Sequence, residues 1–182
     1  MMNNIILIAL EQEAPKMSDW DNVFFTGVGK VNAGITAGKL IERYKPETVF
    51  NFGTAGGVSV TSGIHEIKNF VQRDMKCCEL GFATGQTPFE KGVVLLNGDI
   101  DDICCSTGDN FVSDFTKEEV ISDVVDMEAY AIAKACKQAD VNFRCFKYIS
   151  DSADENANDD WAKTVADGEE HYIKIYKEHT DG

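Results

Sequence analysis

Short apolar runs alternate along this chain with segments whose apolar residues recur at helical spacing. The runs Asn4–Leu10, Thr48–Phe52 and Phe143–Ile149 show little polar alternation, which is typical of strands buried on both faces of a sheet. Segment Lys30–Tyr44 has the spacing of an amphipathic helix, and Pro46 ends it. The alternation predicts an α/β fold with a largely buried central sheet.

The rest of the chain continues this pattern, and its length of 182 residues leads us to expect a single domain over residues 1–182. Shorter strands are predicted at Val23–Thr26, Ile67–Val71, Val93–Leu96 and Ile103–Ser106. Further helices are predicted at Met127–Gln138 and from Asn158 to about Lys177.

The charge and the hydropathy pattern exclude several classes of partner. A net charge of −14 repels nucleic acid and anionic lipid, so we expect neither a nucleic-acid nor a membrane partner. No apolar run reaches membrane-spanning length. The start, MMNNIILIALEQE, lacks a basic region before its apolar run and is predicted to be a buried strand, not a signal peptide.

The six cysteines do not have the spacing of a zinc site or of an ordinary disulfide framework, because four of them form adjacent pairs. The histidines show no ligand spacing with them. We therefore expect no metal, and free, mostly buried thiols in a reducing cytoplasm. The cysteines are Cys77, Cys78, Cys104, Cys105, Cys136 and Cys145.

Acidic residues follow three of the predicted strands. Glu13 comes after the first, Asp126 and Glu128 flank Met127 where a strand is expected to meet the next helix, and Asp151 closely follows the strand Phe143–Ile149. In an open α/β sheet the carboxyl ends of the strands form the ligand crevice. Converging carboxyl groups there suit acid–base chemistry on a small neutral substrate. Helix capping is the alternative for one member of the Asp126–Glu128 pair.

Two glycine-rich segments lack the context of a nucleotide-binding loop. Gly27–Lys30 has no glycine where a phosphate loop needs its first one, and Val31 replaces the Ser or Thr. Gly53–Gly57 follows a strand without a prompt helix, so it is predicted to be a tight turn or a place where a ligand approaches the backbone closely. Phe111, in a predicted loop, is expected to pack in the core, with stacking on a planar ligand as the alternative.

Six segments, in order, resemble the nucleoside phosphorylase/nucleosidase superfamily, most of all its 5′-methylthioadenosine/S-adenosylhomocysteine nucleosidase branch. The resemblance implies a three-layer αβα fold with a mixed, twisted central sheet, and it implies no cofactor. The segments are Ala9–Glu13, Thr26–Ala33, Asn51–Gly57, Gly108–Val112, Val125–Ala129 and Ile149–Asp154.

The resemblance also implies a role for each matching residue. Asp151 would protonate the purine, Glu13 would activate the attacking water, and Glu128 would bind the ribose hydroxyls. The implied substrate contacts are Met127 on the sugar, Phe111 stacked on the base, Val112 at the edge of the base, Ser150, Asp126, and the segment Thr54, Ala55 and Gly56. Trp161 would line the pocket for the 5′ substituent.

The chain is shorter than the family pattern between Glu13 and Gly27 and around Gly92–Ser106. Those regions bear on the subunit interface and on the 5′ pocket more than on the chemistry. The resemblance implies a homodimer, with Asn32–Leu40 and Cys77–Phe89 as the expected contacts.

The expected activity is hydrolysis of the N-glycosidic bond of an adenine nucleoside. Two alternatives stay open: a purine nucleoside phosphorylase that uses phosphate as the nucleophile, and a non-catalytic nucleoside-binding protein. A phosphorylase needs cationic phosphate ligands, and among the three arginines only Arg73 is a candidate. The presence of all three carboxylates argues against the non-catalytic alternative.

Overall fold

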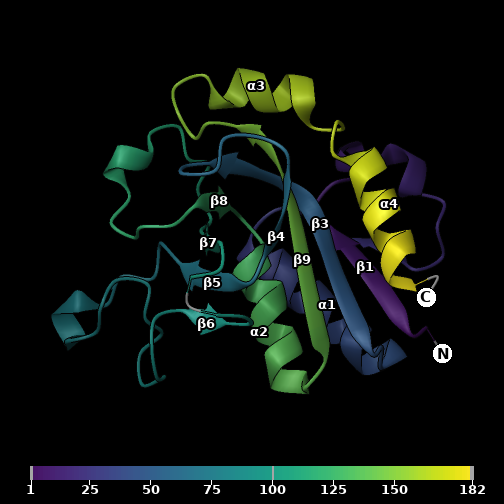
Figure 1. The fold of residues 1–182 in the computed structure, drawn as a ribbon. Helices are drawn as coiled ribbons and strands as arrows, with labels where there is room; N and C mark the ends of the chain where they lie inside the picture. The colour runs from purple at the N-terminus through teal and green to yellow at the C-terminus, as the bar shows by residue number, and fades with distance from the viewer. Residues whose placement is uncertain (1, 100, 181–182) are drawn as a thin grey trace.

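The computed structural model describes residues 2–99 and 101–180. Within these ranges nine strands form one mixed sheet, and helices cover both of its faces (Figure 1). The strands are β1 (Asn4–Ile8), β2 (Val23–Phe25), β3 (Thr48–Gly57), β4 (Ile64–Ile67), β5 (Asn69–Gln72), β6 (Leu95–Leu96), β7 (Cys104–Thr107), β8 (Val124–Asp126) and β9 (Asn142–Asp151). The helices are α1 (Lys30–Tyr44), α2 (Ala129–Ala139), α3 (Ala157–Thr164) and α4 (Glu169–Thr180). The predicted three-layer α/β architecture is confirmed.

The long strand β3 organises the sheet. Its first part, Thr48–Asn51, pairs in parallel with β1 on one side, and residues 48–56 pair in parallel with β9 on the other. Its register against β9 shifts between Ala55 and Gly56, and its last two residues pair antiparallel with β8. The ends of β1, β3, β8 and β9 therefore meet at one edge of the sheet, where a ligand crevice is expected.

Alternation along β1 divides the core between two faces of the sheet, because successive side chains of a strand point to opposite sides. Ile5 and Leu7 pack in a cluster with residues of α1 and α2. Ile6 and Ile8 pack in a second cluster, which includes Tyr172 of α4. Because helices cover both faces of the sheet, β1 is apolar on both of its sides.

The closing helix predicted from Asn158 to about Lys177 is wrong as one element, because α3 and α4 are separate. The chain turns at Asp167–Gly168, where a β-carbon on Gly168 would overlap the Tyr172 hydroxyl. Glu169 at the start of α4 is buried and accepts a hydrogen bond from the Met17 N–H at 3.1 Å. The break lets α4 dock on the sheet while α3 crosses above the sheet edge (Figure 1).

Two further predictions are corrected. The run Ile67–Val71 is not one strand, because the chain leaves β9 after Ile67 and joins β7 from Asn69 onward. Gly53–Gly57 is not a turn, because these residues continue β3 beside β9. Glycine is needed at position 56 because a larger residue has no space: a β-carbon there would lie 2.8 Å from an Asp151 oxygen.

All six cysteines are free, as expected. Only half of them are fully buried: Cys105, Cys136 and Cys145. Burial raises the pKa of Cys136 and of Cys145 to about 12, so these thiols stay protonated at neutral pH. Across residues 2–99 and 101–180, every helix is too short or too polar to span a bilayer.

Candidate active site

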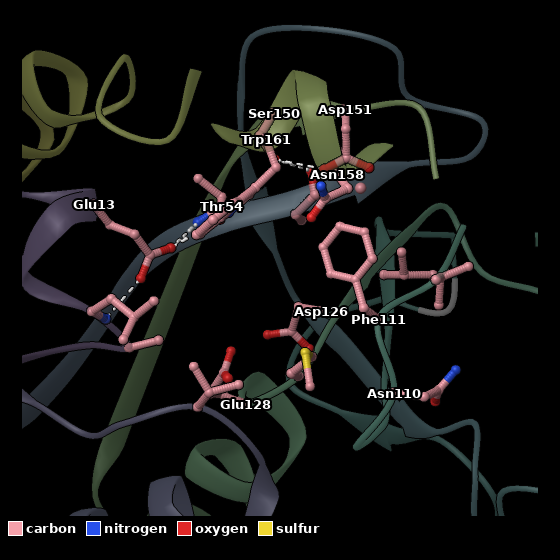
Figure 2. Close-up of a pocket in the computed structure, with 18 of the residues that line it drawn as sticks. Glu13, Thr54, Asn110, Phe111, Asp126, Glu128, Ser150, Asp151, Asn158 and Trp161 are labelled. Carbon is pink, nitrogen blue, oxygen red and sulfur yellow. Dashed lines mark hydrogen bonds between the residues drawn. The ribbon is translucent and has the colours of Figure 1, made fainter. Parts of the chain in front are cut away.

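A cavity of about 210 Å³ opens at the edge where β1, β3, β8 and β9 end, and Figure 2 shows its lining. Every residue predicted for the site lies in this lining: Glu13, Thr54, Ala55, Gly56, Phe111, Val112, Asp126, Met127, Glu128, Ser150, Asp151 and Trp161. The lining also contains residues that were not predicted as site residues: Ala9, Leu10, Val28, Arg73, Asn110, Val125 and Asn158.

Glu13 is held by donors from two directions. It ends a short 3₁₀ helix, η1 (Glu11–Glu13), directly after β1, and only 4% of it is exposed. Its Oε1 accepts hydrogen bonds from the Thr54 backbone N–H and hydroxyl, both at 2.9 Å, and its Oε2 accepts one from the Leu10 N–H at 3.0 Å. Each carboxylate oxygen has about two lone-pair sites, so Oε2 retains one for a further donor.

Asp126 forms a buried ion pair with a residue that the sequence analysis missed. Its Oδ2 lies 2.9 Å from the Lys147 Nζ, and both side chains are almost fully buried. Thr107 donates to the other oxygen at 2.6 Å, and the Ala129 N–H donates to Oδ2 at 2.8 Å, which caps α2. The capping interpretation therefore holds for Asp126. These positive and hydrogen-bonding partners offset burial and hold the pKa of Asp126 below its usual value.

Glu128 sits beside this pair without a cation of its own. Its Oε1 accepts a hydrogen bond from the Gly29 N–H at 2.8 Å, at the start of α1. Burial, followed by repulsion from Asp126, raises the pKa of Glu128 to about 7. The two neighbouring acids therefore differ in protonation at neutral pH: Asp126 is ionised, and Glu128 is divided between its two forms.

Asp151 ends β9 on the opposite wall of the cavity from Glu128, as Figure 2 shows. Its Oδ2 accepts a hydrogen bond from the Ser150 hydroxyl at 2.8 Å, and its Oδ1 accepts one from the Ala153 N–H at 2.9 Å. Partial burial outweighs these bonds and raises its pKa. A carboxyl group with a raised pKa at a cavity wall is suited to donate a proton.

Two aromatic side chains flank the cavity. Phe111 is 47% exposed and faces the cavity, so the expectation that it packs in the core is wrong (Figure 2). Trp161 reaches in from α3, and its indole N–H donates to the Thr54 hydroxyl at 3.1 Å. The same hydroxyl donates to Glu13, so α3 is linked through Thr54 to the acid after β1.

A family model described as "Phosphorylase superfamily" matches residues 22–67 and 102–178 of the chain. The chain belongs to this superfamily. The matched ranges contain α1, β3 and the segments that bear Asp126, Glu128 and Asp151, so the family match and the cavity lie on the same elements.

Curated relatives place the chain near one branch of the phosphorylase superfamily. A protein of Bacillus thuringiensis (strain Al Hakam), named 5′-methylthioadenosine/S-adenosylhomocysteine nucleosidase, is 32% identical over 163 residues. The match covers 73% of this chain and 68% of the relative.

Solved structures show the same fold. A futalosine hydrolase mutant of Helicobacter pylori strain 26695 superposes with a TM-score of 0.87 at 19% identity, covering 100% of this chain and 99% of that one. A Helicobacter pylori nucleosidase mutant with 5′-methylthioadenosine in its active site gives a TM-score of 0.86 at 17% identity, with the same coverage.

In this phosphorylase superfamily member, three residues at or beside the site were not predicted from the sequence, and their sequence contexts differ in how much they indicate. Lys147 is a charged residue in an apolar strand, on the same side as the core residues Cys145 and Ile149, and that position is a recognisable mark of a buried ion pair. Asn110 and Asn158 have ordinary loop and helix contexts that predict nothing specific. The part of the chain that the structure describes contains no cluster of three or more His, Cys, Asp or Glu side chains placed to hold a metal ion.

Proposed function

We propose that this protein hydrolyses the N-glycosidic bond of an adenine nucleoside of the 5′-methylthioadenosine or S-adenosylhomocysteine type, releasing free adenine. One observation carries the proposal: three carboxyl groups with different surroundings, Glu13, Glu128 and Asp151, line the same cavity of about 210 Å³. The nucleosidase name of the 32% identical relative supports the same activity.

Each carboxyl group has a distinct task in this reaction. Cleavage leaves a sugar with oxocarbenium character and a base that departs poorly unless it is protonated. Asp151, with its raised pKa, donates the proton to the base. Glu13 retains a free acceptor site on Oε2, which accepts a proton from the attacking water. Glu128 binds the ribose hydroxyls, and its negative form stabilises the charge that develops on the sugar.

Water is a better candidate for the nucleophile than phosphate. Among the described residues, Arg73 is the one Arg or Lys in the cavity lining, and its terminal nitrogens already donate to four backbone carbonyls. Lys147 is close by but is paired with Asp126. At the cavity, the described residues thus leave no uncommitted Arg or Lys for a phosphate dianion, and the surrounding carboxyl groups repel it.

We also propose that the protein is a homodimer in the cytoplasm. On α1 and the loop before it, Val28, Val31 and Ile35 are 41%, 69% and 52% exposed, and in the segment 77–89 Leu80 and Phe89 are 70% and 92% exposed. Exposed apolar side chains of this kind mark association surfaces, and a two-fold dimer is the commonest arrangement. Free thiols fit a reducing compartment. A monomeric mass by light scattering at micromolar concentration would contradict the dimer.

The deciding experiment is incubation with a panel of purine nucleosides, with and without phosphate. We expect adenine and a free ribosyl product in phosphate-free buffer. Base and ribose 1-phosphate that appear only with added phosphate would establish the phosphorylase alternative. Binding by calorimetry without any base release would establish a non-catalytic binder.

A further inference from the structure

Arg73, which follows β5, is almost completely buried although it belongs to no apolar cluster, with 1% of the residue exposed. Its two terminal nitrogens donate only to backbone carbonyl oxygens. Nη1 donates to Ser106 at 2.6 Å and to Asp126 at 2.7 Å, and Nη2 donates to Gly108 at 3.3 Å and to Asn110 at 2.6 Å. The terminal nitrogens of this buried cation are thus satisfied by peptide groups, while its Nε–H is buried without a hydrogen-bond partner among the described residues.

These acceptors come from separate segments at the cavity edge. Ser106 belongs to β7, Asp126 ends β8, and Asn110 directly precedes Phe111 in the loop after β7. Glu118, later in the same loop, lies 3.8 Å from the Arg73 Nε and accepts a hydrogen bond from the Asn110 side chain at 3.3 Å. One guanidinium group therefore connects β7 and the end of β8 to two positions in the loop, one on each side of Phe111.

The packing around Gly108 is an independent sign that this geometry is tightly set. A β-carbon at Gly108 would lie 2.9 Å from the Arg73 Cζ, closer than real contacts allow. Gly108 does not have a positive φ, so the backbone conformation does not demand glycine there. The residue is glycine because the loop backbone lies directly against the guanidinium group.

We propose that Arg73 is a positioning residue that holds the segment Asn110–Val112 against the cavity and thereby sets the affinity for the purine base. The inference rests on the proposed function, in which Phe111 and Val112 contact the base. Arginine suits the task because its planar group presents five donors in fixed directions, whereas lysine has three on a flexible stem. The loop contacts the base both before and during bond cleavage, so its displacement raises KM more than it lowers kcat.

The sharpest test compares one substitution at two glycines. Gly108→Ala places a methyl group against the guanidinium group, while Gly38→Ala, on the exposed side of α1, meets nothing within 4 Å. We expect Gly108→Ala to raise KM for the nucleoside, and the dissociation constant for adenine, about tenfold, as for one weakened hydrogen bond to a charged group. We expect kcat to change less than about threefold. Gly38→Ala leaves these constants at wild-type values.

Arg73→Lys is the second variant, and we expect it to shift KM in the same direction. Amide hydrogen exchange in residues 109–113 provides a readout that needs no substrate. The proposal predicts faster exchange in this segment for Gly108→Ala and Arg73→Lys, with unchanged exchange in β1 and β3. Unchanged KM and adenine affinity in folded Gly108→Ala would overturn the proposal. It would also be overturned if KM stayed unchanged and kcat fell only in proportion to the fraction of the variant that is unfolded.

The design separates this inference from the proposed function. If the wild type releases adenine and Gly108→Ala behaves like Gly38→Ala, the function stands and the role of Arg73 is wrong. If the wild type releases no base, the proposed function fails, and the exchange measurement still decides whether Arg73 holds the loop.

Discussion

The floor and the rim of the cavity are built differently. The floor consists of Glu13, Thr54, Asp126 and Glu128, which lie on strands or shortly after them. Lys147 lies outside the lining and supports the floor through its ion pair with Asp126. The acids of the floor are at most 7% exposed and accept hydrogen bonds from backbone N–H groups. The rim consists of the loop 109–118 and the segment 152–161, which include the half-exposed Phe111 and the partly buried Trp161.

This contrast separates two roles within one site, catalysis and ligand selection. Acids held by strand ends and backbone donors are in place before substrate arrives, which favours chemistry. Loops with exposed aromatic groups adjust to the ligand and determine what is accepted. We therefore expect floor substitutions to change stability as well as activity, and rim substitutions to change activity with little effect on stability. Asp151, half-buried at the end of β9, lies at the boundary.

The largest expected effect is on activity at this boundary. Asp151→Asn keeps the size of the side chain but cannot donate a proton to the base, so we expect kcat to fall roughly 100- to 10,000-fold. The melting temperature should stay close to wild type, because the Asn carbonyl oxygen still accepts from the Ala153 N–H and the Ser150 hydroxyl can turn to accept from the Asn NH2 group. The matched control is Asp159→Asn on the exposed side of α3, which should leave kcat unchanged. Near wild-type turnover of Asp151→Asn would remove this residue from the mechanism.

Next in size is a loss of stability at the floor. Lys147→Met leaves Asp126 charged, buried and without its cation, and breaking a buried pair from one side costs about 3–5 kcal/mol. Asp126→Asn likewise leaves Lys147 charged, buried and without its anion. Denaturant unfolding measures the free energies, and the double substitution should recover part of the loss. Lys174→Met, which removes an exposed pair with Glu178, is the control and should cost less than about 1 kcal/mol. Equal losses in Lys147→Met and Lys174→Met would contradict the distinction between floor and surface.

The floor could be predicted from sequence better than the rim. The bounds of α1 follow directly from apolar spacing and Pro46, and the strand runs place Glu13 and Asp151 at the same edge. Local pattern does not reveal partners far apart in the chain. The pairing of Lys147 with Asp126 depends on how β9 and β8 flank β3, and the helix break at Gly168 depends on Tyr172. The exposure of Phe111 depends on a loop whose path is set by tertiary contacts such as those of Arg73.

The third prediction uses pH to test the floor. The pKa of Glu128 is about 7 in the folded protein against an ordinary value of 4.5, so between these values the folded state keeps a proton that the unfolded state releases. Stability contributed by this group is present below about pH 4.5 and is lost as pH rises through 7. Glu128→Gln cannot titrate. Its unfolding free energy relative to wild type should therefore rise by roughly 3 kcal/mol from pH 4.5 to above pH 7.

The variant should also lose most of its activity at every pH, because Gln cannot supply the negative charge beside the sugar. A difference in unfolding free energy that stays constant across this pH range would show that folding does not raise the pKa of Glu128. The distinction between the paired Asp126 and the unpaired Glu128 would then be lost.

The smallest expected effect concerns the hydrogen bond that joins rim to floor. The single hydroxyl proton of Thr54 is directed to Glu13, and Trp161 fills a lone pair of the same oxygen. Trp161→Phe keeps an aromatic ring but removes the donor, which frees the hydroxyl to turn away from Glu13. Because one neutral hydrogen bond is worth about 0.5–1.5 kcal/mol, we expect kcat to fall about threefold to tenfold with little change in melting temperature. The matched control is Trp20→Phe, whose ring packs against Tyr176 on the α4 side of the sheet and should leave kcat unchanged. If both variants keep wild-type kcat, the rim does not act on the floor through Thr54, and the two regions work independently.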